Sequence, residues 1–331
     1  MTSNKPKISI LIPTYNSEKY IRKCLNSAIK QTFHNIEIVC LDDCSKDSTY
    51  DILKEYASRD KRIRIYRNKV NKGIATNRNL LIKLCHGEYM FFLDSDDWMF
   101  KTTCKKFVDS LEGENYDMVV GKTKVVFSEW PIIKYNFFPT SSFNSKTNNI
   151  KYVEKNICLC WGCFIRKSYW NKLNIPFNDK VSRVFEDLGI MPYVFLKAKK
   201  FKTVNANFYV YLRRKNSTSK FEGTEYTVLQ HVMKQTDGLL ELFKKEGYLN
   251  NPKYQEAISG CLFAPIGYFI FFRHPRDANS KKIFEKNKIE AFNVLQKTGY
   301  PISAKNKSWW KKILTPLFKI FFKKELKKSK N

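Results

Sequence analysis

The first hundred residues alternate between short apolar runs and segments whose apolar side chains recur at helical spacing. The apolar runs have the length of buried strands and cover residues 7–12, 36–41, 63–66 and 89–93. In the first intervening segment, Ser17 is the expected N-cap of a helix with one apolar face, made by Ile21, Cys24, Leu25 and Ala28. Two further helices are expected over residues 48–56 and 76–85. Strands and helices that alternate in this way predict a parallel α/β sheet.

Polar clusters follow three of the predicted strands. Residues 14–16 follow the first strand, Asp42 and Asp43 the second, and residues 94–96 the fourth. Ligands of open parallel sheets bind in the crevice beyond the carboxyl ends of the strands, so the three clusters are expected to face one crevice. No G-x-G-x-x-G follows the first strand and the chain has no G-x-x-x-x-G-K-[ST]. A pyrophosphate held there would therefore be bound by metal and side chains.

The third cluster contains three carboxylates, Asp94, Asp96 and Asp97. Carboxylates this close repel one another and raise each other's pKa unless a cation is present. Asp-x-Asp spacing suits a hard divalent ion that also takes phosphate oxygens. Taken alone, the cluster is equally consistent with an acidic turn that caps the next helix. Its place on the same edge as the other clusters favours a ligand site.

Charge and length constrain the partners of the protein. The chain has 331 residues, with 60 Lys and Arg against 31 Asp and Glu, and a formal net charge of +29. A negatively charged partner is implied, namely nucleic acid, a sugar nucleotide or an anionic membrane surface. The length suggests two domains or one domain with a long extension.

The cysteines and the apolar runs bear on the cellular compartment. Nine cysteines and a start that leads directly into a strand favour reduced thiols in a cytosol. Cys158, Cys160 and Cys163 have irregular spacing and apolar flanks, which favours buried free thiols over a zinc site. The longest apolar run, residues 261–272, contains Pro265 and Gly267 and is shorter than the ~18 to 20 residues of a membrane-spanning helix.

Five motifs in the first hundred residues, taken together and in this order, resemble glycosyltransferase family 2. They are residues 12–16 (IPTYN), 31–33 (QTF), 41–48 (LDDCSKDS), 71–73 with 78–79 (NKG and RN), and 87–97 (GEYMFFLDSDD). The resemblance extends more weakly to about residue 219. It implies a GT-A, Rossmann-like, mostly parallel sheet flanked by helices. Residues 1–220 would form the glycosyltransferase domain, with a nucleotide-binding half (1–100) and an acceptor half (101–220), and residues 221–331 a helical, basic C-terminal extension.

The resemblance also implies which residues bind the donor: Pro13, Thr14, Tyr15, Asn16, Asp43, Arg78, Asp94, Ser95 and Asp96. Tyr15 is expected to stack near the uracil ring, and Asp43 to accept a hydrogen bond from the base. Arg78 is expected near the phosphates, where a guanidinium fork suits phosphate oxygens. Asp96 is expected to bind Mn²⁺ or Mg²⁺ directly, with Asp94 near the ribose and the water shell of the metal and Asp97 assisting.

The proton acceptor of the reaction is expected within residues 185–189 (FEDLG). The resemblance places Asp187 as general base and Glu186 as a contact to donor or acceptor hydroxyls. A single displacement with such a base inverts the anomeric centre. From the residues alone, the alternative is a helix N-terminus at which acids are stabilised by the macrodipole.

Two further segments carry open alternatives. Trp161 and Gly162 are expected either on the acceptor side, where an aromatic face packs on a sugar ring, or in the core. Arg213, Arg214 and residues 217–219 resemble a basic loop that closes over the phosphates, and a solvated charge run is the alternative.

The C-terminal third differs in kind from the rest. A helix is expected over residues 224–245, and residues 301–331 combine ten Lys and one Glu with interleaved aromatic and aliphatic side chains. A lysine face opposite an apolar face predicts an interfacial helix, which Pro316 would kink, at an anionic membrane surface. The alternative is a basic, disordered tail. We therefore expect a cytoplasmic protein peripherally associated with the inner face of a bacterial cytoplasmic membrane.

These expectations combine into one main hypothesis and two competitors. The main one is an inverting, metal-dependent enzyme that moves a hexose or N-acetylhexosamine from a UDP-sugar to a surface glycan such as lipooligosaccharide, capsule or another envelope polysaccharide. A nucleotidyltransferase would require a Gly-rich phosphate loop after the first strand, which is absent. A basic, non-enzymatic protein that binds nucleic acid or membranes would not need carboxylates clustered along a strand edge. We therefore expect no nucleic-acid partner.

Overall fold

A computed structural model describes residues 5–127, 134–136, 148–179, 185–214, 225–258 and 260–261. Contacts divide the chain into two compact units. The first comprises Met1–Asn149, Leu159–Asp179 and Lys197–Ser217, and the second Ile150–Cys158, Lys180–Leu196 and Thr218–Asn331. The second unit thus takes two segments from the first 220 residues in addition to the C-terminal third. The division of function at residues 100 and 220 stays a prediction.

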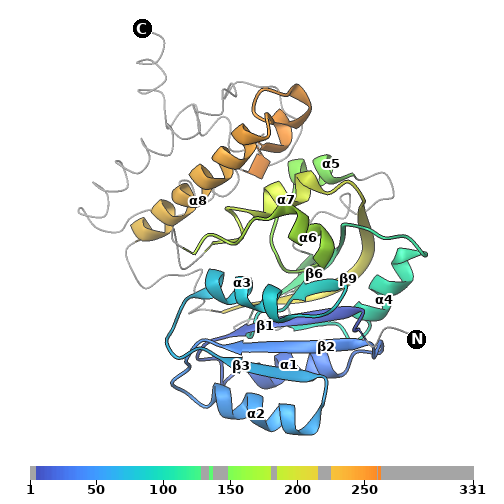
Figure 1. The fold of residues 1–331 in the computed structure, drawn as a ribbon, viewed down its shortest axis with the longest axis vertical. Helices are drawn as coiled ribbons and strands as arrows, with labels where there is room; N and C mark the ends of the chain where they lie inside the picture. The colour runs from blue at the N-terminus through green and yellow to red at the C-terminus, as the bar shows by residue number, and fades with distance from the viewer. Residues whose placement is uncertain are drawn as a thin grey trace. The chain divides into compact units, whose positions relative to one another are not determined.

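The first unit is built on a sheet of nine strands, in the order β3-β2-β1-β4-β8-β6-β9-β5 with β7 beside β6 (Figure 1). Its first four strands are β1 (Ile8–Thr14), β2 (Ile36–Asp42), β3 (Ile63–Arg67) and β4 (Tyr89–Phe92). They pair in parallel, with Ile8 opposite both Ile36 and Tyr89. The parallel sheet predicted from the sequence is confirmed. Strand order reverses at β1, which puts the crevice of such sheets beyond the ends of β1 and β4.

The other half of the sheet is mixed. It consists of β5 (Trp98–Met99), β6 (Met118–Phe127), β7 (Lys134–Asn136), β8 (Cys163–Arg166) and β9 (Phe201–Arg213). Strand β8 runs antiparallel to both β4 and β6, while β9 runs parallel to β6 and antiparallel to β5. The end of β9 therefore passes beside Trp98, directly after the acidic cluster.

Helices cover both faces of the parallel strands. They are α1 (Ile21–Ile29), α2 (Thr49–Arg59), α3 (Ile74–Leu84), α4 (Thr103–Leu111) and α6 (Lys167–Leu173). Figure 1 shows α3 on the face of the parallel strands opposite α1 and α2, as expected when strand order reverses at β1. The predicted apolar face of α1 is confirmed, since its four residues are the buried ones.

The prediction that Ser17 caps α1 is wrong. Tyr20 is the N-cap, with no side-chain hydrogen bond, and the carbonyl of Ser17 accepts from the backbone of Tyr20 and Ile21. The Ser17 hydroxyl is instead 2.7 Å from the hydroxyl of Ser95 and bonds the carbonyl of Tyr15. Ser17 thereby joins the loop after β1 to the loop after β4.

Aromatic rings fill the centre of the sheet. The ring of Phe164 on β8 lies 4.6 Å from that of Phe91 on β4 and stacks at 3.9 Å on Phe107 of α4. Tyr89 meets Phe107 edge to face at 4.8 Å. All nine cysteines are free, eight of them buried and Cys44 partly so, which confirms the prediction of buried thiols.

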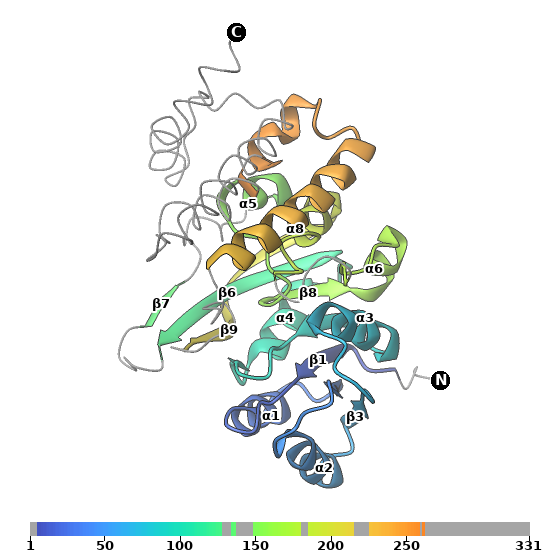
Figure 2. The same ribbon diagram turned by 90° about the vertical axis from the view of Figure 1, so that its left-hand side faces the viewer.

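The second unit is helical in the part that the structure describes (Figure 2). It contains nearly all of α5 (Asn149–Lys155) and α7 (Met191–Lys197), and the whole of α8 (Glu225–Lys245), which confirms the helix predicted over residues 224–245. Tyr152 stacks on Phe195 at 5.3 Å, and the Tyr193 hydroxyl donates to Glu246 at 2.8 Å. Residues 262–272 and the basic segment 301–331 lie outside the described residues.

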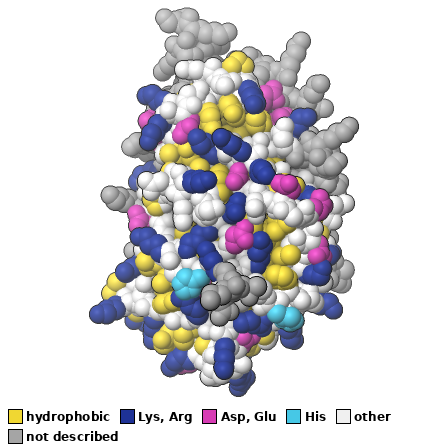
Figure 3. Space-filling model, turned by 45° about the vertical axis from the view of Figure 1, so that its right-hand side comes forward, with side chains coloured by type: hydrophobic (Ala, Val, Ile, Leu, Met, Phe, Trp, Pro, Cys, Tyr) yellow, Lys and Arg dark blue, Asp and Glu magenta, His cyan; other side chains and the backbone are white. Residues whose placement is uncertain are grey.

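Among the described helices, none combines the length and the apolar character that crossing a bilayer requires. Figure 3 shows Lys and Arg side chains spread over one face of the molecule, with Asp and Glu side chains between them.

Candidate active site

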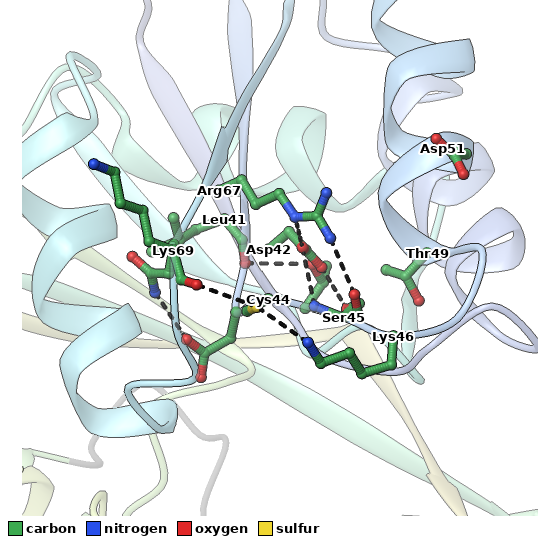
Figure 4. Close-up of polar contacts among 12 residues, drawn as sticks. Leu41, Asp42, Cys44, Ser45, Lys46, Thr49, Asp51, Arg67 and Lys69 are labelled. Atoms are coloured by element: carbon green, nitrogen blue, oxygen red, sulfur yellow. Dashed lines mark hydrogen bonds and ion pairs between the residues drawn. The ribbon is translucent and has the colours of Figure 1, made fainter.

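The two aspartates at the end of β2 have different environments. Asp42 is fully buried. Its carboxylate accepts from the Ser45 backbone and from Nε of Arg67, both at 3.1 Å, and from the Ser45 hydroxyl (Figure 4). Cys44 has a φ of 62°, so the chain turns sharply around these bonds. Asp42 therefore shapes the loop.

Asp43 links this loop to the start of α3. Its backbone N–H donates to the carbonyl of Thr14 at 2.8 Å, and its side chain is buried. The carboxylate accepts from the side-chain amide of Asn68 and from the backbone N–H groups of Lys72 and Gly73, each at 2.8 Å. Asp43 thus fixes the segment between β3 and α3. Its predicted hydrogen bond to the base stays a prediction.

Residues 13–16 form the end of β1 and the loop that follows it. Pro13 and Thr14 are buried, whereas Tyr15 is 47% exposed, a large ring left open at this edge. Asn16 has a φ of 46° and bonds the backbone of Lys46 through its side chain at 2.9 Å. The loops after β1 and β2 are therefore tied together, with Tyr15 projecting from them.

The loop after β4 carries two carboxylates that are each paired with an arginine. Arg78 of α3, which is buried, donates to Asp94 at 3.0 Å. Arg214, just beyond β9, forms an ion pair with Asp96 and lies over the ring of Tyr20, 4.4 Å from its centre. The structure thus brings Arg78, Asp94, Asp96 and Arg214 together at the carboxyl edge. The contact of Tyr20 with Arg214 was not predicted, because nothing in the sequence around Tyr20 indicates which distant residue its ring contacts.

The pKa of Asp96 reflects this crowding. Burial raises the pKa of Asp96, the charge of Arg214 opposes the rise, and repulsion by Asp94 adds to it. Two carboxylates that repel each other across a short gap favour a bound cation. A positive charge at this position therefore stabilises the ionised form of Asp96.

Asp97 differs from its neighbours. It is buried, and its two oxygens accept from the hydroxyl of Tyr209 at 2.6 Å and from the backbone of Leu212 at 2.7 Å. Burial raises the pKa of Asp97 well above its usual range. Both oxygens of Asp97 accept from residues of β9, so Asp97 fastens this strand to the acidic loop. The assisting role expected for Asp97 beside a metal stays a prediction.

Trp161 is nearly buried, with 9% of its surface exposed. Its ring stacks on Tyr209 at 5.1 Å and on Tyr211 at 5.7 Å. The arrangement matches the alternative of a core tryptophan, whose ring packs on two tyrosines of β9.

Glu186 and Asp187 belong to the second unit. Both are buried. Phe185 has a φ of 58°, and the backbone of Met191, at the start of α7, donates to the carbonyl of Asp187 at 2.8 Å. The side chain of Asp187 also accepts from the N–H of Leu188 at 3.0 Å. The pair therefore lies at a helix start, as predicted, where backbone N–H groups stabilise a carboxylate.

The carboxylates of the acidic loop suit a divalent cation that takes only part of its ligands from the protein and the rest from water or substrate. Within the described residues, no group of three or more His, Cys, Asp and Glu side chains converges to hold a metal by itself. Asp94 and Asp96 nevertheless supply the carboxylate oxygens that Mg²⁺ and Mn²⁺ prefer. Mg²⁺ is typically held by one or two carboxylates together with substrate phosphates, which matches this pair.

Comparison with known proteins assigns the family. The model of glycosyl transferase family 2 matches residues 9–173. The chain belongs to this family. The match includes all three polar clusters at the carboxyl edge, whereas Arg214 lies beyond it. Membership of this family identifies the protein as a glycosyltransferase.

The chain covers very different shares of two similar proteins. Glycosyltransferase GlyA of Streptococcus pneumoniae is 30% identical over 224 residues, which are 65% of this chain but 32% of GlyA. The chain therefore spans about a third of that relative. The processive diacylglycerol beta-glycosyltransferase of Mycoplasma genitalium is 28% identical over 317 residues, which cover 88% of this chain and 89% of the relative.

A solved structure agrees with the fold. The structure of S. aureus TarS 1–349 in complex with UDP-GlcNAc superposes with a TM-score of 0.57 at 22% identity, covering 88% of this chain and 90% of that one. The family and this likeness together confirm the GT-A, Rossmann-like fold expected from the sequence.

Proposed function

We propose that this glycosyltransferase moves a hexose or N-acetylhexosamine from a UDP-sugar to a hydroxyl of a growing surface glycan, with inversion at the anomeric carbon. The observation that carries the proposal is the pairing of Asp94 with Arg78 and of Asp96 with Arg214 at one sheet edge. The two carboxylates can bind a metal ion, and the two neighbouring guanidinium groups can bind the oxygens of a diphosphate. The relative solved with UDP-GlcNAc supports the choice of donor.

In this proposal the loops after β1 and β2 bind the nucleoside. The exposed ring of Tyr15 offers a stacking surface for uracil, with Pro13, Thr14 and Asn16 forming the same wall. Asp43 is held by three N–H groups and retains lone pairs, because a carboxylate accepts at about four sites. One of these is available to the N3 proton of the base.

Asp94 and Asp96 would hold Mn²⁺ or Mg²⁺, with Ser95 between them linked to Ser17. When bound, the ion supplies Lewis-acid stabilisation of charge on the departing diphosphate. Arg78 and Arg214 present guanidinium groups to the same place, and a guanidinium fork suits phosphate oxygens. Their ion pairs with the aspartates keep these side chains oriented toward the edge.

Asp187 is the proposed general base and Glu186 a contact to sugar hydroxyls. A base that takes the acceptor proton in a single displacement produces inversion.

The acceptor is proposed to be a glycan of the cell envelope, free or attached to a lipid. A second acceptor class, the hydroxyl of a lipid itself, is favoured by the relative named as a diacylglycerol beta-glycosyltransferase, because the alignment covers nearly all of both chains. Either acceptor is compatible with a cytoplasmic enzyme that associates with the inner membrane surface through residues 301–331.

A donor panel tests the proposal. Purified protein is incubated with UDP-glucose, UDP-galactose and their N-acetylated forms, with Mn²⁺ or with a chelator, and release of UDP is measured. We expect one donor to be consumed only with metal. Asp187→Asn is expected to retain UDP binding and to lose at least about a hundredfold in rate. UDP release that is unchanged by the chelator and by Asp187→Asn would contradict the proposal.

A further inference from the structure

In the part of helix α8 whose side chains are described, residues 234–245, the buried face includes the polar residues Gln235 and Thr236. Leu239, Leu240 and Phe243 are buried there, as expected for an amphipathic helix. Gln235, 1% exposed, and Thr236, 5% exposed, interrupt this apolar face. The helix lies beyond the residues 9–173 that match the family, so the family match assigns no role to them.

The side chain of Gln235 packs directly on the turn that carries Glu186 and Asp187. A Cβ placed on Gly189 would lie 2.1 Å from Oε1 of Gln235, 3.1 Å from its Cδ and 3.3 Å from its Cβ. No side chain fits between them, so the amide of Gln235 lies against the α-carbon of Gly189. Gly189 is two residues from Asp187. The position of Gln235 therefore limits where this turn can move.

The amide nitrogen of Gln235 is a buried donor that no group in the described part of the chain satisfies. Among the described residues, Nε2 has no hydrogen-bond partner. Buried polar groups are nearly always bonded, because leaving one unpaired costs its lost hydration. A leucine at this position would fill a similar volume without that cost. An unsatisfied donor beside a turn with two buried carboxylates indicates a partner from outside the chain.

We propose that Gln235 is an acceptor-binding residue. Its Nε2 N–H donates to a hydroxyl oxygen of the acceptor, and its packing on Gly189 holds the turn that presents Asp187 to that hydroxyl. The inference rests on the proposed function and assigns α8, outside the matched family region, to the acceptor site.

The test compares Gln235→Leu with wild type and with Lys234→Ala, an exposed neighbour on α8. The acceptor probes are n-octyl β-glucoside and n-octyl β-galactoside, whose binding is measured by saturation-transfer NMR without donor and whose KM is measured with it. We expect Gln235→Leu to weaken probe binding and raise KM for the probe about tenfold, which corresponds to one lost hydrogen bond. Affinity for UDP is expected to stay unchanged, and Lys234→Ala is expected to match wild type throughout.

Thermal unfolding separates binding from structure. Because Nε2 is unsatisfied, Gln235→Leu is expected to unfold at the wild-type temperature or above it. A lower unfolding temperature together with wild-type probe binding would overturn the inference, since Gln235 would then be structural. Wild-type protein that binds a probe but consumes no UDP-sugar would contradict the proposed function. The comparison of probe binding by Gln235→Leu and by wild type would still decide whether Gln235 binds a sugar hydroxyl.

A second variant tests the packing. Gly189→Ala places a methyl group where the amide of Gln235 lies. We expect it to lower kcat more than it changes affinity for UDP, because it displaces the turn with Asp187. Unchanged kcat would overturn the positioning part of the inference.

Discussion

Aspartates that lie close together in the sequence have different partners in this protein. Asp42 and Asp97 are buried, and their carboxylate oxygens accept hydrogen bonds from backbone N–H groups, which fixes two loops. Asp94 and Asp96 hold arginines at the edge of the sheet. The acidic cluster was recognisable in the sequence, but the task of each member was not. Tyr209, which decides the role of Asp97, lies 112 residues away.

Asp97→Asn tests this division at the residue scale. The amide would keep one acceptor and place N–H groups where Asp97 now accepts, from the hydroxyl of Tyr209 or the backbone of Leu212. We expect a loss of about 2–3 kcal/mol in the free energy of unfolding, measured by urea titration. The matched control is Asp109→Asn, an exposed residue paired with Lys105, which is expected to change stability by less than about 1 kcal/mol. Equal effects of the two substitutions would refute the structural role of Asp97.

At the scale of elements, the amino-terminal edge of the sheet is held by one carboxylate. Glu37 of β2 accepts from the Ser9 hydroxyl on β1 at 2.6 Å, from Arg64 on β3 at 2.8 Å, and from the backbone of His86 and Gly87 ahead of β4. Burial alone would raise the pKa of Glu37, but the hydrogen bonds from Ser9, His86 and Arg64 outweigh it and the pKa is lowered. Four strands therefore depend on the ionised form of Glu37.

The lowered pKa predicts a pH dependence of stability. The unfolded chain binds the proton at about pH 4.3, and the folded chain only at lower pH. The stabilisation from Glu37 is thus complete above about pH 5 and is lost as pH falls through the folded pKa. We expect wild type to lose more stability than Glu37→Gln between pH 7 and about pH 3, in urea titrations at several pH values. Parallel curves for the two proteins would show that the carboxylate does not have this role.

The sequence predicted the elements that follow from local apolar patterns and missed the features that depend on contacts between residues far apart in the chain. Strands β1 to β4 and helices α1 to α3 follow from apolar periodicity over a few residues. The pairing of β6 with β8 and β9 joins Val119 to both Phe164 and Lys202, contacts that no local pattern encodes. The wrong prediction of a cap at Ser17 has the same origin, because its hydroxyl is bonded to Ser95, which is 78 residues away in the sequence.

At the scale of the whole molecule, the formal charge of +29 requires an explanation beyond the donor site. Residues 301–331 contribute ten Lys against one Glu, and a lysine near an anionic bilayer is worth about 1 kcal/mol. The membrane role of this segment stays a prediction from the sequence.

A truncated chain of residues 1–300 tests it. We expect the full chain to co-sediment with phosphatidylserine vesicles at low salt and to be released by about 0.5 M salt, which screens the attraction. Vesicles of phosphatidylcholine serve as the uncharged control. The truncated chain should bind phosphatidylserine poorly while its affinity for UDP is unchanged. Equal vesicle binding by both chains would place the membrane contact elsewhere.

The most direct test of the account is metal-dependent binding of UDP at the paired carboxylates and arginines. Calorimetric titration with UDP compares wild type, Asp96→Asn and Asp109→Asn, each with Mn²⁺ and with a chelator. We expect the chelator to weaken UDP binding by wild type and by Asp109→Asn at least about tenfold, and Asp96→Asn to bind UDP weakly with or without Mn²⁺. Equal affinity for UDP in all six titrations would contradict a metal-assisted nucleotide site at this edge of the sheet.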